Sequence, residues 1–276
     1  MISLTLALVA AVGYGLSDFI GGVASRRTTA WPVAFLAAIA AAVMTLLVAL
    51  TVGGSPSMSD LIWGGLAGVG SGFGGAFLYR GLASGRMGVV APISAVGAAL
   101  IPLPAAIFMG ERPTLIAWVG IVLALPGIWM VSREPAAHAT AAGVTDGLLA
   151  GLGFGLLFVA AGQVTPEAGL LPLAITQVIG AASVAVTATL LGQAWLPRRT
   201  VDLWGVLAGT LAASAMICFL LATHHGYLSI SAVITSLYPA ATIALAAVFL
   251  KERFSASQGV GMALCLLAVV LVGLAN

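Results

Sequence analysis

Charged residues are scarce in this chain of 276 residues, where ten basic and eight acidic side chains together make up 7% of the sequence. A soluble domain of ordinary composition contains about 25% charged residues. Hydrophobic residues instead make up 61%. So few charges cannot cover the surface of a soluble fold of this length, and we expect lipid to surround most of the exterior. The small net charge of +2 also leaves no basic stripe for nucleic acid.

Strict alternation of polar and apolar residues is missing as well. The apolar segments run for about 20 residues, which suits a membrane-spanning helix, whereas the strands of a membrane barrel alternate over about ten residues. A backbone in lipid must satisfy its own hydrogen bonds, and a helix does so within one segment. The expected fold class is therefore all-α and integral to the membrane. The two cysteines, Cys218 and Cys265, lie inside apolar segments and are interpreted as small core side chains.

The apolar segments predict ten transmembrane helices separated by short connections. Five of them form a first domain at 1–131, a polar linker follows at 132–145, and five more form a second domain at 146–276. No segment is long or polar enough to form a soluble domain. The predicted helices cover about residues 3–24, 31–52, 61–83, 87–108, 114–131, 146–164, 169–192, 202–224, 228–250 and 255–275.

The two halves repeat one another at a spacing of 140 to 141 residues. The matches keep the same order along several helices, which chance similarity between apolar helices does not explain. Each half has five helices, an odd number, so the second half must enter the membrane in the opposite direction. The sequence thus predicts two inverted five-helix repeats, an architecture common among secondary transporters. The matching segments include Gly13–Gly15 with Gly153–Gly155, Trp63-Gly64 with Trp204-Gly205, and Glu111-Arg112 with Glu252-Arg253.

Short motifs at the end of each fourth predicted helix add a resemblance to a known family. The first copy reads Phe108-Met109-Gly110-Glu111-Arg112-Pro113, and the second reads Phe249-Leu250-Lys251-Glu252-Arg253. Together with the duplication, these motifs resemble the EamA-like transporters of the drug/metabolite transporter superfamily. The family proline corresponds to Pro239 in the second half, but its first-half counterpart is Ala98, and prolines appear instead at Pro92, Pro102 and Pro104.

The resemblance implies a secondary carrier that works by alternating access around a central cavity. Such a protein would export an amino acid, another small metabolite or a drug-like compound across the plasma membrane, and it would be neither an enzyme nor dependent on a cofactor. The expected partners are the solute, the lipid bilayer and a coupling proton, while the oligomeric state is left open. The alternatives are a flippase for lipid-linked substrates, an intramembrane enzyme and a non-transporting scaffold. Enzymatic motifs such as His-Glu-x-x-His, Gly-x-Ser-x-Gly and paired intramembrane aspartates are absent from the sequence.

Asp18 is the acidic residue that the predicted helices place within the membrane. A carboxylate at a helix centre costs about 2.5–3.5 kcal/mol on insertion scales, so such residues usually face a cavity or a partner. We interpret Asp18 as a proton-coupling group or as the counter-ion of a cationic solute; the alternative is a residue near the helix end that reaches the interface. Other candidate cavity residues combine an apolar body with a polar group, and no metal site is predicted. They are Tyr14, Tyr79, Gln177 and Tyr238.

Two further patterns are interpreted as structural. Glu111 and Glu252 lie at turns between helices, where a carboxylate near a helix start is favoured by the helix dipole. Gly64, Gly68 and Gly72 are spaced by four residues, which places them on one helix face where another backbone can approach closely.

Basic residues predict the orientation in the membrane. Nine of the ten lie in the odd-numbered connections between the predicted helices, and Arg112 is the exception. Basic residues favour the cytoplasmic side. Both termini are therefore expected outside.

Overall fold

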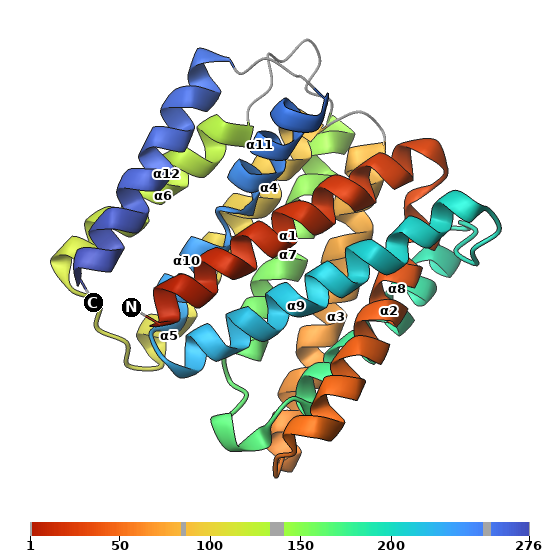
Figure 1. Cartoon of the computed structure of the whole chain (residues 1–276), viewed down its shortest axis with the longest axis horizontal. Helices are drawn as coiled ribbons and strands as arrows, with labels where there is room; N and C mark the ends of the chain where they lie inside the picture. The colour runs from red at the N-terminus through yellow and green to blue at the C-terminus, as the bar shows by residue number, and fades with distance from the viewer. Residues whose placement is uncertain (1, 84–86, 133–140, 251–254, 276) are drawn as a thin grey trace.

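The computed structural model describes residues 2–83, 87–132, 141–250 and 255–275, and within these ranges the chain is helical without a β-strand (Figure 1). Twelve α-helices and two short 3-10 helices follow one another in the described residues. They are α1 (Ile2–Arg27), α2 (Ala30–Val52), α3 (Met58–Ala83), α4 (Met87–Leu100), α5 (Pro102–Phe108), α6 (Leu115–Ser132), α7 (Ala141–Ala161), η1 (Pro166–Ala168), α8 (Leu171–Leu190), η2 (Thr200–Leu203), α9 (Trp204–His224), α10 (Leu228–Thr235), α11 (Tyr238–Leu250) and α12 (Ala256–Ala275).

Two predicted helices are broken in the structure, which corrects the prediction of ten continuous helices. The segment at 87–108 divides into α4 and α5, and the segment at 228–250 divides into α10 and α11. Proline has no backbone N–H and cannot continue a helical hydrogen-bond ladder, although it is accepted in the first turn. Pro102 begins α5, and Pro239 is the second residue of α11. Each break therefore lies just before a proline. These prolines stand at different places in the two halves.

Among the residues that the structure describes, six helices are long and apolar enough to cross a membrane, judged by length and composition. They are α1, α2, α3, α7, α8 and the segment Thr200–His224. Four shorter apolar helical segments occupy the remaining predicted spans, at Ile93–Phe108, Leu115–Met130, Leu228–Thr242 and Gly259–Ala268. Many large apolar side chains point outward, as a lipid-facing surface requires. The chain is thus a multi-pass membrane protein, and the number of ten crossings stays a prediction.

The second half begins earlier than predicted. Helix α6 ends at Ser132 and α7 begins at Ala141, so the helix includes part of the predicted linker at 132–145. Asp146 consequently lies within α7 and is buried. The interpretation of Asp18 as the acidic residue within the helices is therefore wrong, because Asp60 in α3 and Asp146 in α7 also lie within helices and are buried.

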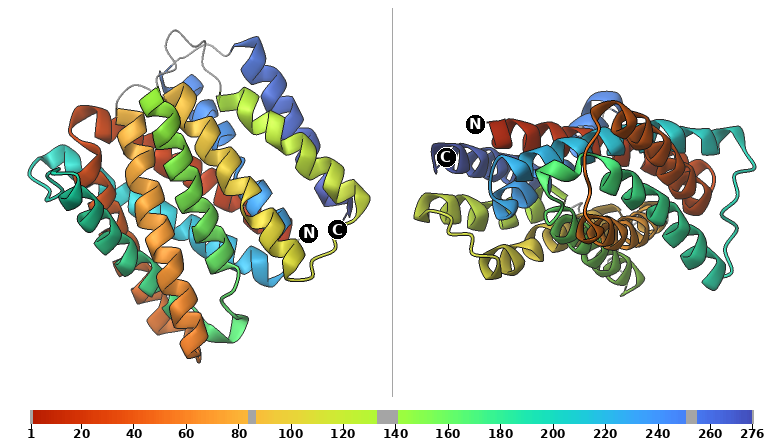
Figure 2. Two further views of the ribbon diagram at one scale, coloured as in Figure 1. Left: turned by 180° about the vertical axis from the view of Figure 1, so that it is seen from behind. Right: turned by 90° about the horizontal axis from the view of Figure 1, so that it is seen from below.

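Packing between the halves is reciprocal. Helix α3 packs on α7 and α8, and its counterpart α9 packs on α1 and α2, the counterparts of α7 and α8. Helices α2 and α8 also pack on each other, as do α6 and α12. Figures 1 and 2 show α1 and α9 side by side on one face of the bundle and α3, α7 and α4 on the other. Reciprocal contacts of this kind are produced by a two-fold axis between two similar units.

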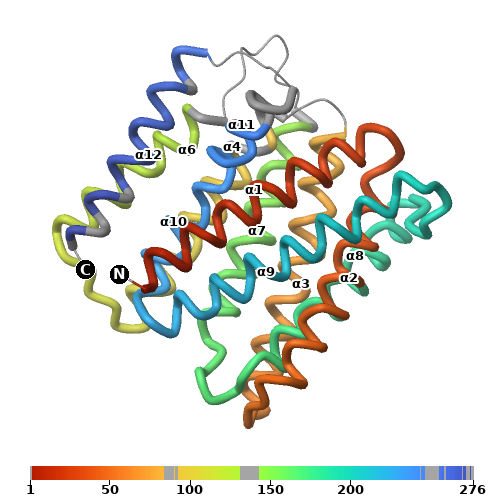
Figure 3. Tube along the Cα trace, in the orientation of Figure 1, coloured from red at the N-terminus to blue at the C-terminus, as the bar shows by residue number. Residues whose placement is uncertain are grey.

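The directions of the packed helices identify how the halves are related. Along the α6–α12 contact, Gly127 lies against Cys265 and the Ser257 hydroxyl donates to the Met130 carbonyl, so these counterpart helices run antiparallel. The trace in Figure 3 shows α6 and α12 side by side at the edge of the bundle. Counterparts that run in opposite directions are what an inverted repeat requires.

Glu111 joins the two halves at the start of α10. Its carboxylate accepts hydrogen bonds from the backbone N–H groups of Leu228 and Ser229 and from the Ser229 hydroxyl, the last at 2.6 Å. These N–H groups belong to the first turn of a helix, where they have no partner within the helix. The interpretation of Glu111 as a structural residue at a helix start agrees with this contact, whereas Glu252 lies outside the described residues.

Candidate functional site

A small cavity lies in the middle of the bundle, between three helices of each half. Its volume is about 100 Å³, which is room for a few water molecules or a small solute. The first half contributes α1, α2 and α3, and the second contributes their counterparts α7, α8 and α9. The lining residues are Tyr14, Ser17, Asp18, Ala34, Ala37, Ala38, Ala41, Ser71, Gly72, Gly75, Leu78, Tyr79, Phe154, Leu157, Gln177, Val184, Gly209, Ala212 and Met216.

The cavity lies where the axis relating the two halves is expected. Tyr14 and Phe154 both line it and are 140 positions apart (154 − 14). Four more lining pairs have the repeat spacing, so equivalent positions of both halves face the same space. The members of each pair differ chemically, so the two halves share a scaffold while the polar groups differ. These pairs are Ser17 with Leu157, Ala37 with Gln177, Ser71 with Ala212, and Gly75 with Met216.

One face of α2 makes space for the cavity. Ala34, Ala37, Ala38 and Ala41 all line it and follow the spacing of one helix face. Their methyl groups leave a volume that larger side chains would fill. Sequence reasoning missed this face, although the run of alanines at helical spacing was a signal for it.

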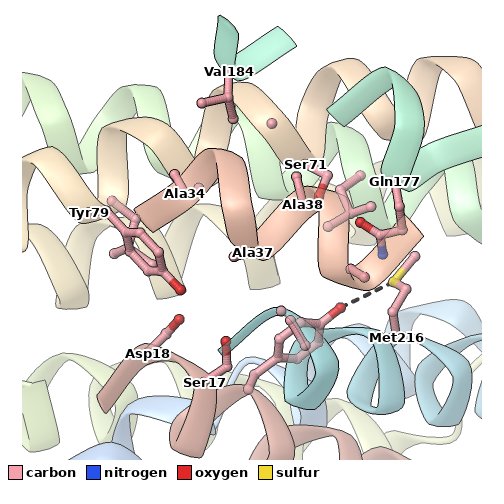
Figure 4. A pocket seen from close by; sticks show the side chains of 18 of the residues that line it. Ser17, Asp18, Ala34, Ala37, Ala38, Ser71, Tyr79, Gln177, Val184 and Met216 are labelled. Carbon is pink, nitrogen blue, oxygen red and sulfur yellow. Dashed lines mark hydrogen bonds between the residues drawn. The ribbon is translucent and has the colours of Figure 1, made fainter. Parts of the chain in front are cut away.

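Asp18 extends from α1 into the cavity, where Figure 4 shows its carboxylate facing the Tyr79 hydroxyl. It is the one charged side chain of the lining. Asp18 interacts electrostatically with the hydroxyls of Tyr14, Tyr79 and Tyr238. Within the described part of the chain, it has neither a hydrogen-bond partner nor an ion pair. The carboxylate thus has tyrosines around it but no fixed cation.

Tyr79 lies opposite Asp18 and is held in place from α1. Its side chain is buried, and its hydroxyl lies close to the Ser17 side chain of α1. Gly21 makes room for the ring, since a Cβ added there would overlap the phenol. Because Gly21 has no side chain, the Tyr79 hydroxyl can lie directly against α1, one turn beyond Ser17.

Tyr14 and Gln177 bring further polar groups to the cavity. The Tyr14 hydroxyl donates to the Met216 sulfur, at 3.1 Å (Figure 4). The Gln177 side chain is buried in α8 and lines the same space. The structure therefore brings four of the five candidate residues, Asp18, Tyr14, Tyr79 and Gln177, into one cavity.

Tyr238 is the candidate that does not line the cavity. It begins α11, is buried, and its hydroxyl is hydrogen-bonded with the Ser94 hydroxyl of α4 at 3.1 Å. It still lies within electrostatic range of Asp18. Its hydroxyl thus connects the fourth helical segments of the two halves at the edge of the site.

A charged pair next to the cavity was missed by sequence reasoning. Arg80 follows Tyr79 at the end of α3, and its Nε donates to the Asp146 carboxylate of α7 at 3.0 Å. A terminal guanidinium nitrogen of Arg80 donates to the same oxygen. Asp146 is only 2% exposed, whereas the Arg80 side chain is partly exposed. Asp146 stood at the predicted start of the helix, and the observed start at Ala141 places it one turn inside α7.

No curated protein matches the chain. A solved structure described only as "Crystal structure of protein" matches with a TM-score of 0.71 and 17% sequence identity, over 97% of this chain and 96% of the other. At this identity the likeness concerns the fold alone.

The family comparison covers nearly the whole sequence, in two copies. The model of the EamA-like transporter family matches residues 1–133 and again residues 141–274. This result confirms the resemblance seen in the sequence motifs and establishes a two-repeat membrane architecture. The chain belongs to the EamA-like transporter family, within the drug/metabolite transporter superfamily.

Proposed function

We propose that this protein is a secondary carrier that exports a small solute by alternating access through the central cavity. The observation that carries the proposal is the cavity itself, which is lined by counterpart helices of both halves and holds one unpaired carboxylate. A site on the axis of an inverted repeat keeps equivalent surroundings when one half rocks against the other. The cavity can then open to either side of the membrane in turn.

Asp18 is the proposed coupling residue. A carboxylate inside the bundle is costly, and residues of this kind in membrane helices mark solute pathways and proton relays. Binding and release of a proton by Asp18 would change the charge of the cavity and link solute movement to the proton gradient. The neighbouring tyrosine hydroxyls and Gln177 would orient the solute through hydrogen bonds.

Transport is tested with purified protein in liposomes that contain a pH-sensitive dye. A panel of amines, amino acids, organic acids and neutral compounds is added with and without a pH gradient. We expect wild-type protein to couple proton flux to one class of solute. Asp18→Asn should abolish this coupling, whereas the matched carboxylate-to-amide control Glu167→Gln, at an exposed position in η1, should keep it. Equal coupled flux in wild type and Asp18→Asn would contradict the proposal.

The second candidate function, a flippase for lipid-linked substrates, is tested in the same liposomes. A fluorescent lipid in the outer leaflet would become protected from a membrane-impermeant quencher if the protein moved lipids. The small volume of the cavity favours a small water-soluble solute over a lipid, so we expect no lipid movement.

A further inference from the structure

We infer that the solute is a small organic cation bearing an ammonium group, an inference that rests on the proposed transport function. The chemistry of the cavity lining supports it. Asp18 is the one charged residue of the lining, and neither lysine, arginine nor histidine contributes to it. An anionic solute would find a carboxylate and no cation, which is repulsive at short range in a medium of low dielectric constant.

The missing partner of Asp18 points to the same conclusion. Buried charges in proteins are paired or hydrogen-bonded, because an isolated one loses its hydration without compensation. Arg80 directly follows the lining residue Tyr79 in α3, but it already forms an ion pair with Asp146. The cation that would complement Asp18 is therefore expected to come from the solute.

The remaining walls suit a cation with an apolar body. Tyr14, Tyr79 and Phe154 bring aromatic side chains, whose faces attract ammonium groups. Met216 adds a polarisable sulfur. Alanine and glycine complete the surface and offer no further charge. A sugar would need many more hydrogen-bonding groups, and the volume of about 100 Å³ limits the solute to a small molecule in this conformation.

Choline and its neutral isostere 3,3-dimethylbutan-1-ol test this inference, because they have the same shape and differ in charge. Ethanolamine serves as a primary ammonium, and propionate serves as an anion. Binding is measured by thermal shift and calorimetry on purified protein in detergent. We expect at least one ammonium compound to bind at least tenfold more tightly than the neutral isostere and propionate. Asp18→Asn should remove this preference, and Tyr79→Phe should weaken cation binding while the protein remains folded.

The outcomes separate this inference from the proposed function. Preferential binding or transport of propionate or of the neutral isostere would overturn the cation assignment while leaving a transporter. Cation binding without flux of any compound through liposomes would leave the assignment standing and contradict transport. Failure of every ammonium compound to bind, alongside flux of another solute class, also overturns the assignment.

The Arg80–Asp146 pair carries a second, independent inference. We propose that it is a latch that keeps one end of the transport path closed. It joins α3 of the first half to α7 of the second, directly beyond the cavity residue Tyr79. The repeat places Leu221 at the position equivalent to Arg80 (221 − 80 = 141) and Leu6 at the position equivalent to Asp146 (146 − 6 = 140). One end of the bundle therefore has a charged pair, whereas leucines occupy the equivalent positions at the other end.

This asymmetry has a consequence for an inverted repeat. Two identical halves would give the two open states similar free energies, whereas a charged pair at one end favours the state closed there. Arg80 lies in the last turn of α3, next to the third connection, on the side that the distribution of basic residues assigns to the cytoplasm. The latch is thus expected to close the cytoplasmic end.

Cysteine accessibility tests the latch without knowledge of the solute. Ser71→Cys places one reactive thiol in the cavity after Cys218 and Cys265 have been changed to alanine. A membrane-impermeant maleimide is then applied to inside-out membrane vesicles, which expose the cytoplasmic face.

Neutralising the latch should make the cavity thiol more accessible from that face. Arg80→Gln or Asp146→Asn should raise the labelling rate at least tenfold, and the exchange of both charges (Arg80→Asp with Asp146→Arg) should return it toward the original value. Arg80→Lys, a milder change, should give an intermediate rate, and Arg198→Gln, a control at an exposed arginine, should leave the rate unchanged. The latch would be overturned if the neutralised and lysine variants were labelled at the rate of the original protein. It would also be overturned if the exchanged variant were labelled as fast as the neutralised variants.

Discussion

Replacing Gly68 by alanine should destabilise the bundle, because this glycine lets α3 and α8 approach closely. A Cβ added at Gly68 would lie 2.5 Å from the Thr176 carbonyl oxygen and 2.7 Å from the Ile179 Cβ. Ordinary van der Waals contact begins at 3.4 Å, so the two helices would have to separate by about 0.9 Å. Inserting a methyl group into a packed interface typically costs about 1–3 kcal/mol.

The same separation would break a hydrogen bond between the helices. The Thr176 hydroxyl donates to the Gly64 carbonyl of α3 at 2.8 Å. Moving α8 away by about 0.9 Å along this direction would lengthen the distance between the Thr176 and Gly64 oxygens beyond the hydrogen-bond range of about 3.2 Å. Such bonds contribute about 0.6 kcal/mol on average between membrane helices. The hydroxyl also bonds to the Pro172 carbonyl within α8, so it would not be left without a partner.

Gly65 provides the matched control on the same helix. A Cβ at Gly65 would meet no atom within 4 Å. Both substitutions replace glycine by alanine in a helix and gain about 1 kcal/mol in helix propensity, so this gain cancels in the comparison. The difference between Gly68→Ala and Gly65→Ala therefore isolates the packing cost, about 1–3 kcal/mol.

Thermal unfolding of both variants in the same detergent and at the same heating rate measures this difference. At about 2–4 °C per kcal/mol for chains somewhat shorter than this one, Gly68→Ala should unfold roughly 2–12 °C below Gly65→Ala. The control should equal or exceed wild type. Equal unfolding temperatures for the two variants would refute the close approach of α3 and α8 at Gly68.

Three further predictions follow from single contacts. Glu111→Gln should lower stability by about 1–2 kcal/mol in thermal unfolding, because the charged cap of α10 loses strength, whereas full stability would contradict the cap. Tyr238→Phe removes the hydroxyl that bonds to Ser94, so thermal unfolding should show a loss of about 1 kcal/mol while cation binding is kept; lost binding at normal stability would instead place Tyr238 in the solute site. Alkaline phosphatase fused after Asn276 should be active, since the basic residues place both termini outside, and fluorescence of green fluorescent protein at the same position would reverse the orientation.

Much of the site could be predicted from residue chemistry. Asp18 and the tyrosines stood out because a polar group inside a lipid-facing helix needs a reason to be there. The repeat spacing then indicated that two halves would meet around a central space. Tyr79 lies at the cavity and Tyr238 beside it, yet the sequence offered no means to distinguish them. Their placement depends on which helix faces turn inward, and helices that are apolar all round carry little periodicity to show this.

The sequence by itself determined the membrane class, the duplication and the family, because these depend on composition, segment length and order along the chain. Only the tertiary structure decided where the helices break, since a proline at position 102 or 239 can end a helix, bend it or open its first turn according to its neighbours. Tertiary structure also decided the partners of charged groups. Arg80 and Asp146 are 66 positions apart, and nothing in their local sequence indicates that α3 and α7 pack so that the two meet. Contacts between distant segments arise from the way glycine and alanine faces fit together across the two halves, which is a property of surfaces in three dimensions.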